Sequence, residues 1–329
     1  MQCSTFGRAD FMRVPLPAAM ITMFRAMRAS TTKAAIIGSW LLALLLLGGC
    51  STVRIGYNQA PTLAWWWLDS YMDFDAEQAP KVKEALNHWF AWHRTTQLPA
   101  YADLLAAAQT QVLQPATPQQ VCRWADDLRV RLAPAFAQGV PMAAELLPTL
   151  KPEQLAHLER RYRKSNRDFE EDFLQQEADE RLKASVKRTI DRAEMLYGRL
   201  DERQRQLVAT GVTASPFDPA AWFAERQAVQ SETLQTLARL SAGGPARADR
   251  ESNLSGLQAL AARVQRSPPG PYRNYQQRLT EYNCIFIAQL HNSTTPAQRQ
   301  TARNKLKGWE EDLRALAAQK PAARSDAAL

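Results

Sequence analysis

The sequence is poor in the side chains that most often build metal and thiol sites. Only four histidines and four cysteines occur among its 329 residues. His88 and His93 are five residues apart, which places them about 140° apart around a helix and separates them as ligands for one ion. Glu84 and His88 share a helical face, but a metal site needs further ligands in register, so this pair is typical of a structural contact. We therefore expect no metal and no cofactor.

Catalytic motifs are also missing. The sequence contains no HExxH, no GxSxG, no CxxC and no glycine-rich loop of the kind that cradles phosphates. The usual signatures of metalloproteases, serine hydrolases, nucleotide-binding proteins and thiol-redox enzymes are therefore absent. This favours a protein that is not an enzyme, while an envelope hydrolase with an unrecognised site stays open as an alternative.

The apolar run near the N-terminus is too short to cross a membrane. Residues 34–47 form a stretch of 14 residues, whereas a spanning helix needs about 20. Basic residues precede this run, and Gly48, Gly49 and Cys50 follow it, which is the pattern of a secretory signal that ends in a lipobox. We expect cleavage between Gly49 and Cys50 and a covalent lipid on Cys50.

The first 22 residues do not resemble the start of a signal peptide, because they contain Asp10 and Pro15 where basic residues are usual. We expect translation to start at Met23, so that residues 1–49 hold the signal peptide. In lipoproteins resembling this one, an Asp directly after the lipid-bearing Cys favours the inner membrane. Ser51 stands there, so we expect the periplasmic face of the outer membrane.

Charge of one sign is not in large excess. The chain has 41 basic and 33 acidic residues, and removal of residues 1–49 leaves 36 and 32. A mildly basic, evenly mixed surface in the periplasm argues against a nucleic-acid partner. The expected partners are the membrane, through the lipid anchor, and an envelope protein whose identity the sequence does not reveal.

Two cysteines, Cys122 and Cys284, remain once Cys3 is removed and Cys50 is acylated. Disulfides persist in the oxidising periplasm, which favours a bridge between them. Free cysteines also pack well in protein cores. A disulfide and two buried thiols are therefore both compatible with the sequence.

Helical periodicity fills the mature chain, and no period-two strand pattern occurs. Apolar side chains at three-four spacing, such as Leu306, Trp309 and Leu313, suit antiparallel helix packing. The predicted helices are 61–76, 79–94, 98–113, 118–133, 140–147, 152–197, 201–210, 218–241, 249–265, 271–292 and 296–318. We expect an all-α bundle of antiparallel helices that includes one long charged helix.

The domain organisation follows from these elements. Residues 50–60 are expected to form a lipidated tether, residues 61–320 the helical periplasmic domain, and residues 321–329 a disordered tail. Gly211 is placed to end a helix. The charged helix over 152–197 is compatible with two interpretations, a solvated helix with internal ion pairs and an exposed arm that recognises a partner.

Several helix starts share one pattern, a capping position followed three residues later by Gln. The four copies are Thr117-Pro-Gln-Gln, Lys151-Pro-Glu-Gln, Asp201-Glu-Arg-Gln and Thr295-Pro-Ala-Gln. Two of them, at Leu150-Lys-Pro-Glu-Gln and Leu200-Asp-Glu-Arg-Gln, resemble the Leu-Thr-x-x-Gln motif of small periplasmic helical chaperones, with the Thr replaced. That resemblance implies a chaperone-like module as an alternative function.

Aromatic side chains are concentrated in residues 57–74. Trp65, Trp66 and Trp67 cover about 200° of a helix, which is wider than one face of a bundle, so at least one ring lies off the core. Two interpretations stay open for this segment: burial among several neighbours, and docking on a membrane or a partner. The candidate contact residues are Trp65, Trp66, Trp67, Asp69, Tyr71 and Asp73.

The lipobox, the Tyr57-Asn58 pair and the segment Trp-Trp-Leu-Asp-Ser-Tyr-Met-Asp-Phe from Trp66 to Phe74 resemble a bacterial lipoprotein family that is classed only as a domain of unknown function. The resemblance implies an outer-membrane lipoprotein and supplies no catalytic residue. We therefore predict a lipid-anchored interaction or scaffold protein that acts in envelope maintenance.

Overall fold

The computed structural model describes residues 52–174, 177–242 and 249–319. The predicted signal peptide, Gly49, Cys50 and the predicted tail at 321–329 lie outside these ranges. Within the described ranges every regular element is a helix and no strand occurs, so the expected all-α multi-helix fold is confirmed. None of the described helices is both long enough and apolar enough to span a bilayer.

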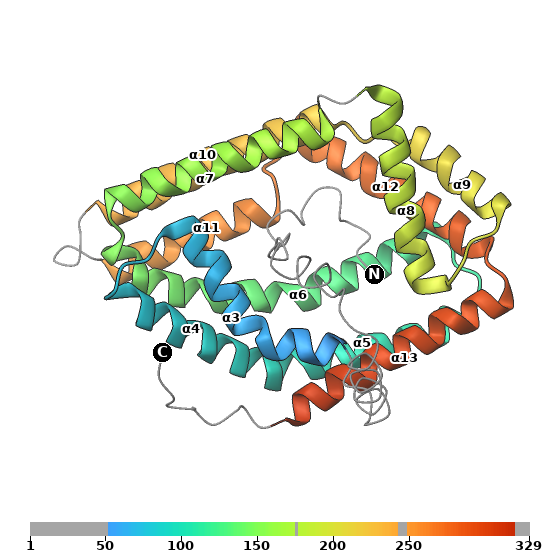
Figure 1. Ribbon diagram of the computed structural model, residues 1–329, viewed down its shortest axis with the longest axis horizontal. Helices are drawn as coiled ribbons and strands as arrows, with labels where there is room; N and C mark the ends of the chain where they lie inside the picture. The colour runs from blue at the N-terminus through green and yellow to red at the C-terminus, as the bar shows by residue number, and fades with distance from the viewer. Residues whose placement is uncertain (1–51, 175–176, 243–248, 320–329) are drawn as a thin grey trace, which may run out of the picture.

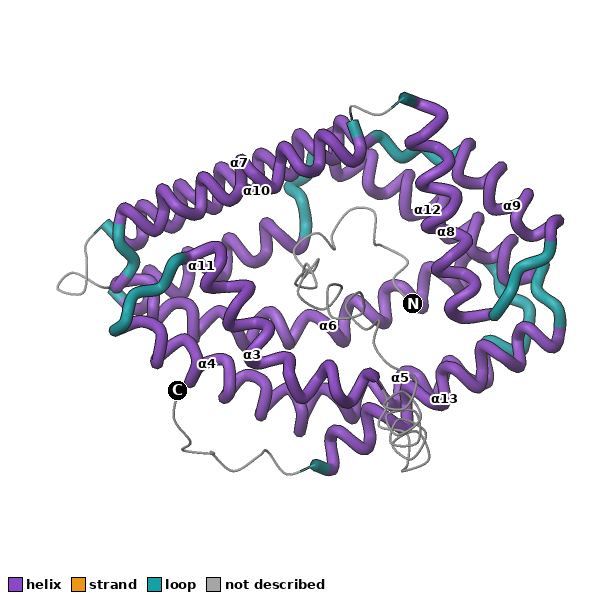
Figure 2. Tube along the Cα trace, in the orientation of Figure 1, coloured by secondary structure: helices purple, strands orange, loops and turns teal. Residues whose placement is uncertain are grey.

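The helices follow one another with short connections (Figures 1 and 2). In chain order they are α3 (Thr52–Met72), α4 (Gln78–Trp92), the π-helical turn η2 (His93–Gln97), α5 (Leu98–Gln111), α6 (Pro118–Leu146), the 3-10 turn η3 (Leu147–Thr149), α7 (Pro152–Phe173), α8 (Ala178–Tyr197), α9 (Glu202–Thr213), α10 (Pro219–Ser241), α11 (Arg250–Gln265), α12 (Pro271–Asn292) and α13 (Pro296–Ala318).

Capping side chains explain why the helices start where they do. Thr117 and Thr295 each accept a hydrogen bond from the backbone N–H of the Gln three residues later, and a proline occupies the first helical position in both cases. Asp218 accepts from two backbone N–H groups at the start of α10. These contacts satisfy donors that the first turn of a helix leaves free.

The helices form an extended multi-helix bundle, called the frame below, whose buried residues do not gather in one core. In Figure 1, α7 and α10 run together along one long edge, α5 and α13 along the opposite edge, and α6 between them. The buried residues accordingly fall into separate clusters, each where two or more helices meet. Leu306 lies in the cluster beside α5, and Trp222 and Phe223 lie in the cluster that joins α10 to α7.

The prediction of a tether over residues 50–60 is wrong for the residues that the structure describes. Residues 52–60 are helical, and Pro61, expected to open the first helix, lies inside α3. Arg54, Tyr57 and Asn58 have partners outside α3, including the ion pair between Arg54 Nε and Asp312 Oδ1 at 3.2 Å. Packing of this segment against the body explains why it is not an extended linker.

The charged segment over residues 152–197, which we expected to form one long helix, forms two helices in the structure. α7 ends at Phe173 and α8 begins at Ala178. No proline or glycine marks the break in the sequence. Phe169 packs on Trp222 and Phe223, with Phe173 beside them, so contacts with α10 hold the end of α7 while α8 turns away to pack on α9 and α13. Within α7, ion pairs such as Arg163 with Glu159 at 2.6 Å follow the expected i, i+4 spacing.

Two further boundaries differ from the sequence prediction. The segments predicted at 118–133 and 140–147 form the single helix α6, which continues through Pro134 and Pro141. Gly211, expected to end a helix, lies within α9, and its backbone carbonyl accepts a hydrogen bond from Tyr282 Oη at 2.6 Å. A Cβ at this position would overlap the ring of Phe286, so the glycine permits the close approach of α9 and α12.

Candidate functional site: the aromatic helix α3 and its neighbours

The Tyr57-Asn58 pair locks α3 to the end of α4. Tyr57 Oη lies 2.8 Å from His93 Nδ1, and Arg94 donates to Asn58 Oδ1 at 2.8 Å. The Arg94 guanidinium also lies 5.0 Å from the centre of the Tyr57 ring and donates to the carbonyl of Leu316 at 3.1 Å. Two consecutive residues of α3 thus contact two consecutive residues of the π-helical turn. One of these, Arg94, also connects α3 to α13.

His93 is a neutral, packed side chain in this joint. Its ring stacks on Trp89 with centroids 4.7 Å apart. Burial lowers the pKa of His93 to about 4 and raises the pKa of Tyr57 to about 12. Both groups therefore stay uncharged at neutral pH, which suits a hydrogen-bonded joint better than proton transfer. His88, by contrast, is exposed, so the structure does not bring the two histidines together.

The three tryptophans occupy different environments. Trp65 stacks on Phe74 with centroids 5.8 Å apart, and Trp67 packs against Tyr71 at 5.2 Å. Trp66 is 58% exposed and is one of the most exposed large apolar side chains that the structure describes. The expectation that one ring lies off the core thus applies to Trp66, and the other two serve intramolecular packing.

Asp69 and Asp73 serve the turn after α3. Asp69 Oδ1 accepts from the backbone N–H of Phe74 at 3.1 Å, so this carboxylate caps the end of the helix. Asp73 has a positive φ of 52°, and its backbone carbonyl accepts from Gln154 Nε2 at 3.0 Å. The Asp73 carboxylate is exposed, with His157 Nδ1 3.9 Å away. The i, i+4 spacing therefore does not build a cation site here.

A pair of glutamines joins the starts of α4 and α7. Gln78 Nε2 donates to Gln154 Oε1, and Gln154 Nε2 donates to Gln78 Oε1. Each side chain also closes a capping contact at its own helix, Gln78 with Asp75 and Gln154 with the backbone N–H of Lys151. Both glutamines are buried. We call this arrangement the first glutamine latch.

The same arrangement recurs at the other end of the frame. Gln204 at the start of α9 and Gln298 at the start of α13 donate to each other's carbonyl oxygens at 2.8 and 2.9 Å. We call it the second glutamine latch. The tyrosine and histidine contact recurs as well, because Tyr197 Oη lies 2.8 Å from His291 Nδ1. The recurrent capping pattern in the sequence signalled these helix starts, but not that they pair across the fold.

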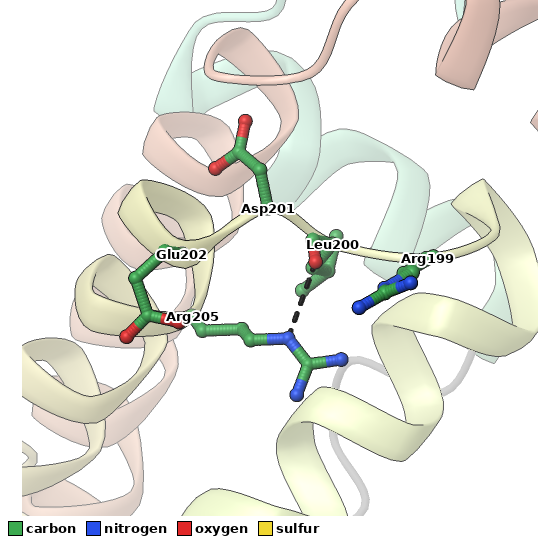
Figure 3. Close-up of a pocket in the computed structure, with 5 residues that line it drawn as sticks. All are labelled: Arg199, Leu200, Asp201, Glu202 and Arg205. Carbon is green, nitrogen blue, oxygen red and sulfur yellow. Dashed lines mark hydrogen bonds between the residues drawn. The ribbon is translucent and has the colours of Figure 1, made fainter.

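A surface hollow of ≈ 470 Å³ lies beside the second latch, lined by Arg199, Leu200, Asp201, Glu202 and Arg205 (Figure 3). The charged groups in it serve the local fold. Arg205 donates to the carbonyl of Leu200 at 3.2 Å and pairs with Glu194 at 2.6 Å. Asp201 caps α9. Across the described ranges, no group of three or more His, Cys, Asp or Glu is placed to hold a metal ion.

A family model for DUF6279, a family of unknown function, matches residues 70–251. The chain belongs to this family. The match begins inside α3 and takes in the first glutamine latch and the π-helical turn, whereas the Tyr57-Asn58 pair and the predicted lipobox precede it. Comparisons with curated proteins and with solved structures find no match to this chain.

Cys122 and Cys284 are joined by a disulfide, with Cα atoms 5.5 Å apart. The bond ties the first turns of α6 to the middle of α12, beside the buried Val121 and Ala288. Of the two arrangements that the sequence left open, the structure has the bridge.

One feature that the sequence did not lead us to expect is an exposed apolar stripe on α6. Between Arg131 and Glu145 the helix carries no charged side chain. The exposed residues within this stretch are Pro134, Phe136, Ala137, Pro141 and Ala143, and Val130 is exposed just before it; Val130 is 69% and Phe136 43% exposed. The sequence signal for this exposed surface was the uncharged stretch itself. That stretch spans the gap between the helices predicted at 118–133 and 140–147.

Proposed function

We propose that the chain is a lipid-anchored scaffold protein at the periplasmic face of the outer membrane, working in envelope maintenance. The observation that carries the proposal is that Thr52, only two residues after Cys50, already belongs to the helix α3. A lipid on Cys50 would then be attached almost directly to the folded body. An enzyme that must reach dispersed substrates gains from a long flexible tether, whereas a scaffold gains from a fixed position at the membrane.

The arrangement of the helices supports a scaffold in a second way. The two glutamine latches hold helix starts together at opposite ends of the frame, and the disulfide ties the first turns of α6 to the middle of α12. Buried, mutually satisfied side-chain hydrogen bonds favour one defined arrangement. Such a frame presents a large helical surface from a position that its anchor determines.

The first test concerns the anchor. We expect mass spectrometry of the N-terminal peptide to find an acylated Cys50, and the protein to fractionate with outer membranes. Cys50→Ala should leave the unprocessed precursor, and Ser51→Asp should move the protein to the inner membrane. An unmodified thiol at Cys50 in the mature protein would contradict the proposal.

The second test separates a scaffold from a tethered enzyme. A Gly-Ser segment inserted between Ser51 and Thr52 keeps the lipid but separates it from α3. We expect a deletion strain to be sensitive to detergent, this variant to fail to restore resistance, and the same insert after residue 245, between α10 and α11, to restore it. Full complementation by the Ser51 insertion would favour an activity that needs no fixed position.

A chaperone-like function is the second candidate, and the apolar stripe on α6 favours it. Apolar side chains without charge bind unfolded chains with little sequence preference, because they offer no specific polar contacts. We expect the protein to suppress aggregation of a reduced, unfolded client, and Val130→Ser with Phe136→Ser to abolish the effect. The matched control is Thr280→Ala on α12, an exposed polar site. No suppression by the unsubstituted protein would remove this candidate.

A further inference from the structure

The exposed side of α3 forms an uncharged stripe along the whole helix. Its exposed residues recur every three or four positions, which places them on one face. They include Thr52, Ile55, Gln59, Thr62, Trp66 and Ser70. Ile55 is 55% and Trp66 58% exposed. A helix face that meets only water usually carries charges, so this stripe is suited to a less polar neighbour.

The orientation of α3 is determined by contacts on its other sides. Tyr57 joins it to the end of α4, and Arg54 joins it to α13. On the side of α7, the backbone carbonyl of Ser70 lies 3.1 Å from His157 Nε2, and Tyr71 packs against Tyr162 with ring centroids 6.3 Å apart. The stripe with Trp66 therefore cannot turn inward without breaking these contacts.

Basic side chains flank the stripe on both neighbouring helices. Lys83 of α4 places its Nζ 4.8 Å from the ring centre of Trp65. Arg161 of α7 places its Cζ 5.2 Å from the ring centre of Tyr71. Trp65 and Tyr71 lie on opposite sides of Trp66 around α3, so on each side of the exposed stripe a cation lies over an aromatic ring. This combination matches the interface of a bilayer, where indoles lie at headgroup depth and cations contact phosphates.

We propose that α3 lies flat on the bilayer with its uncharged stripe inward, and that Lys83 and Arg161 select anionic phospholipid headgroups. This inference rests on the proposed lipid anchor, because the chain outside the described residues leads from Thr52 directly to Cys50. A lipid there would bring the first turn of α3 to the membrane. A helix of 21 residues is about 30 Å long, so Ile55 and Trp66 would contact the surface at two separated points.

The test uses the complete lipidated protein in phosphatidylcholine vesicles that contain a minor fraction of brominated lipid, which quenches indole fluorescence on contact. We expect Trp66→Phe to remove most of the lipid-dependent quenching, and Trp222→Phe, which removes a buried indole, to leave it unchanged. Brominated phosphatidylglycerol should quench more than brominated phosphatidylcholine. Lys83→Gln or Arg161→Gln should each reduce the enrichment of the anionic lipid about fivefold.

The outcomes distinguish this inference from the anchor on which it rests. A protein that does not float with the vesicles contradicts the lipid anchor. A protein that floats but whose quenching is unaffected by Trp66→Phe contradicts the docking of α3. Equal quenching by the two brominated lipids overturns the selection of anionic headgroups. A photo-crosslinker at Trp66 that captures a defined protein in place of lipid in cells would also overturn the docking.

Discussion

Gln78 Nε2 donates to Gln154 Oε1 at 3.1 Å, and Gln154 Nε2 donates to Gln78 Oε1 at 2.7 Å. The two side chains come from helix starts that are 76 residues apart in the chain. Each amide group also serves backbone groups, since Gln154 Nε2 reaches the carbonyl of Met72 at 3.1 Å. The latch therefore satisfies polar groups of three segments inside a buried site, where unpaired donors and acceptors are costly.

We expect Gln154→Met to lower the free energy of unfolding by about 2 kcal/mol, because the apolar side chain leaves buried carbonyl groups and Gln78 without their donor. Urea unfolding followed by circular dichroism measures the change. Gln120→Met is the matched control, since Gln120 closes the same kind of capping box with Thr117 but is only partly buried. An equal loss in the two variants would mean that capping, not the latch, stabilises the fold.

The sequence was sufficient to predict the all-helical fold and where most helices begin, because three-four apolar spacing and capping residues are local signals. Thr295, for example, was predicted to start a helix from its own side chain and the proline after it, and it does. The latches were not predictable, because the partner of Gln154 depends on how distant helices pack. The same limit applies to Gly211, whose role depends on a ring from α12.

The candidate site was only partly predictable, because tertiary contacts between distant segments decide the roles of its side chains. The width of three consecutive tryptophans already placed at least one ring off the core face, but only the structure shows that this ring is Trp66 and that it is exposed. Asp69 and Asp73 were candidate contact residues, and the structure shows that the Asp69 carboxylate caps the backbone turn after α3. The break after Phe173 had no local signal, since it follows from packing on α10.

The disulfide should contribute strongly to stability. It links residues 162 positions apart, and the chain-entropy estimate for a loop of this size is about 5 kcal/mol. We expect Cys122→Ser with Cys284→Ser to unfold at much lower urea concentration than the oxidised protein and at the same concentration as the reduced protein. Peptide mapping without reduction should recover the linked pair. Recovery of two free thiols from periplasmic protein would contradict the bridge.

Stability should fall on mild acidification. The pKa of His93 is about 4 in the folded protein, against about 6.5 in an unfolded chain. Between these values the unfolded chain binds a proton that the folded protein does not, so this contribution is present above pH 6.5 and is lost as the pH falls toward 4. Allowing for partial exposure of the ring, we expect a loss of about 2 kcal/mol.

Urea midpoints measured from pH 7.5 to 4.5 test this dependence. His93→Gln should flatten the profile over this window, and His88→Gln, at an exposed position of the adjoining helix α4, should not change it. His291 contributes in the same direction, because burial lowers its pKa as well. A profile of unchanged slope in the His93 variant would show that other groups cause the acid sensitivity.

Because α9 and α12 approach closely, we expect one Gly→Ala substitution to have the opposite effect on stability from the one that helix propensity predicts. Alanine is favoured over glycine inside a helix by about 1 kcal/mol. At Gly211, however, a Cβ would overlap the Phe286 ring, so we expect Gly211→Ala to destabilise the protein by about 1–3 kcal/mol. At Gly308, inside α13, a Cβ would meet no atom within 4 Å, and Gly308→Ala should therefore stabilise the protein. Phe286→Leu should relieve much of the loss in the Gly211 variant, and stabilisation by both alanines would show that the ring yields freely.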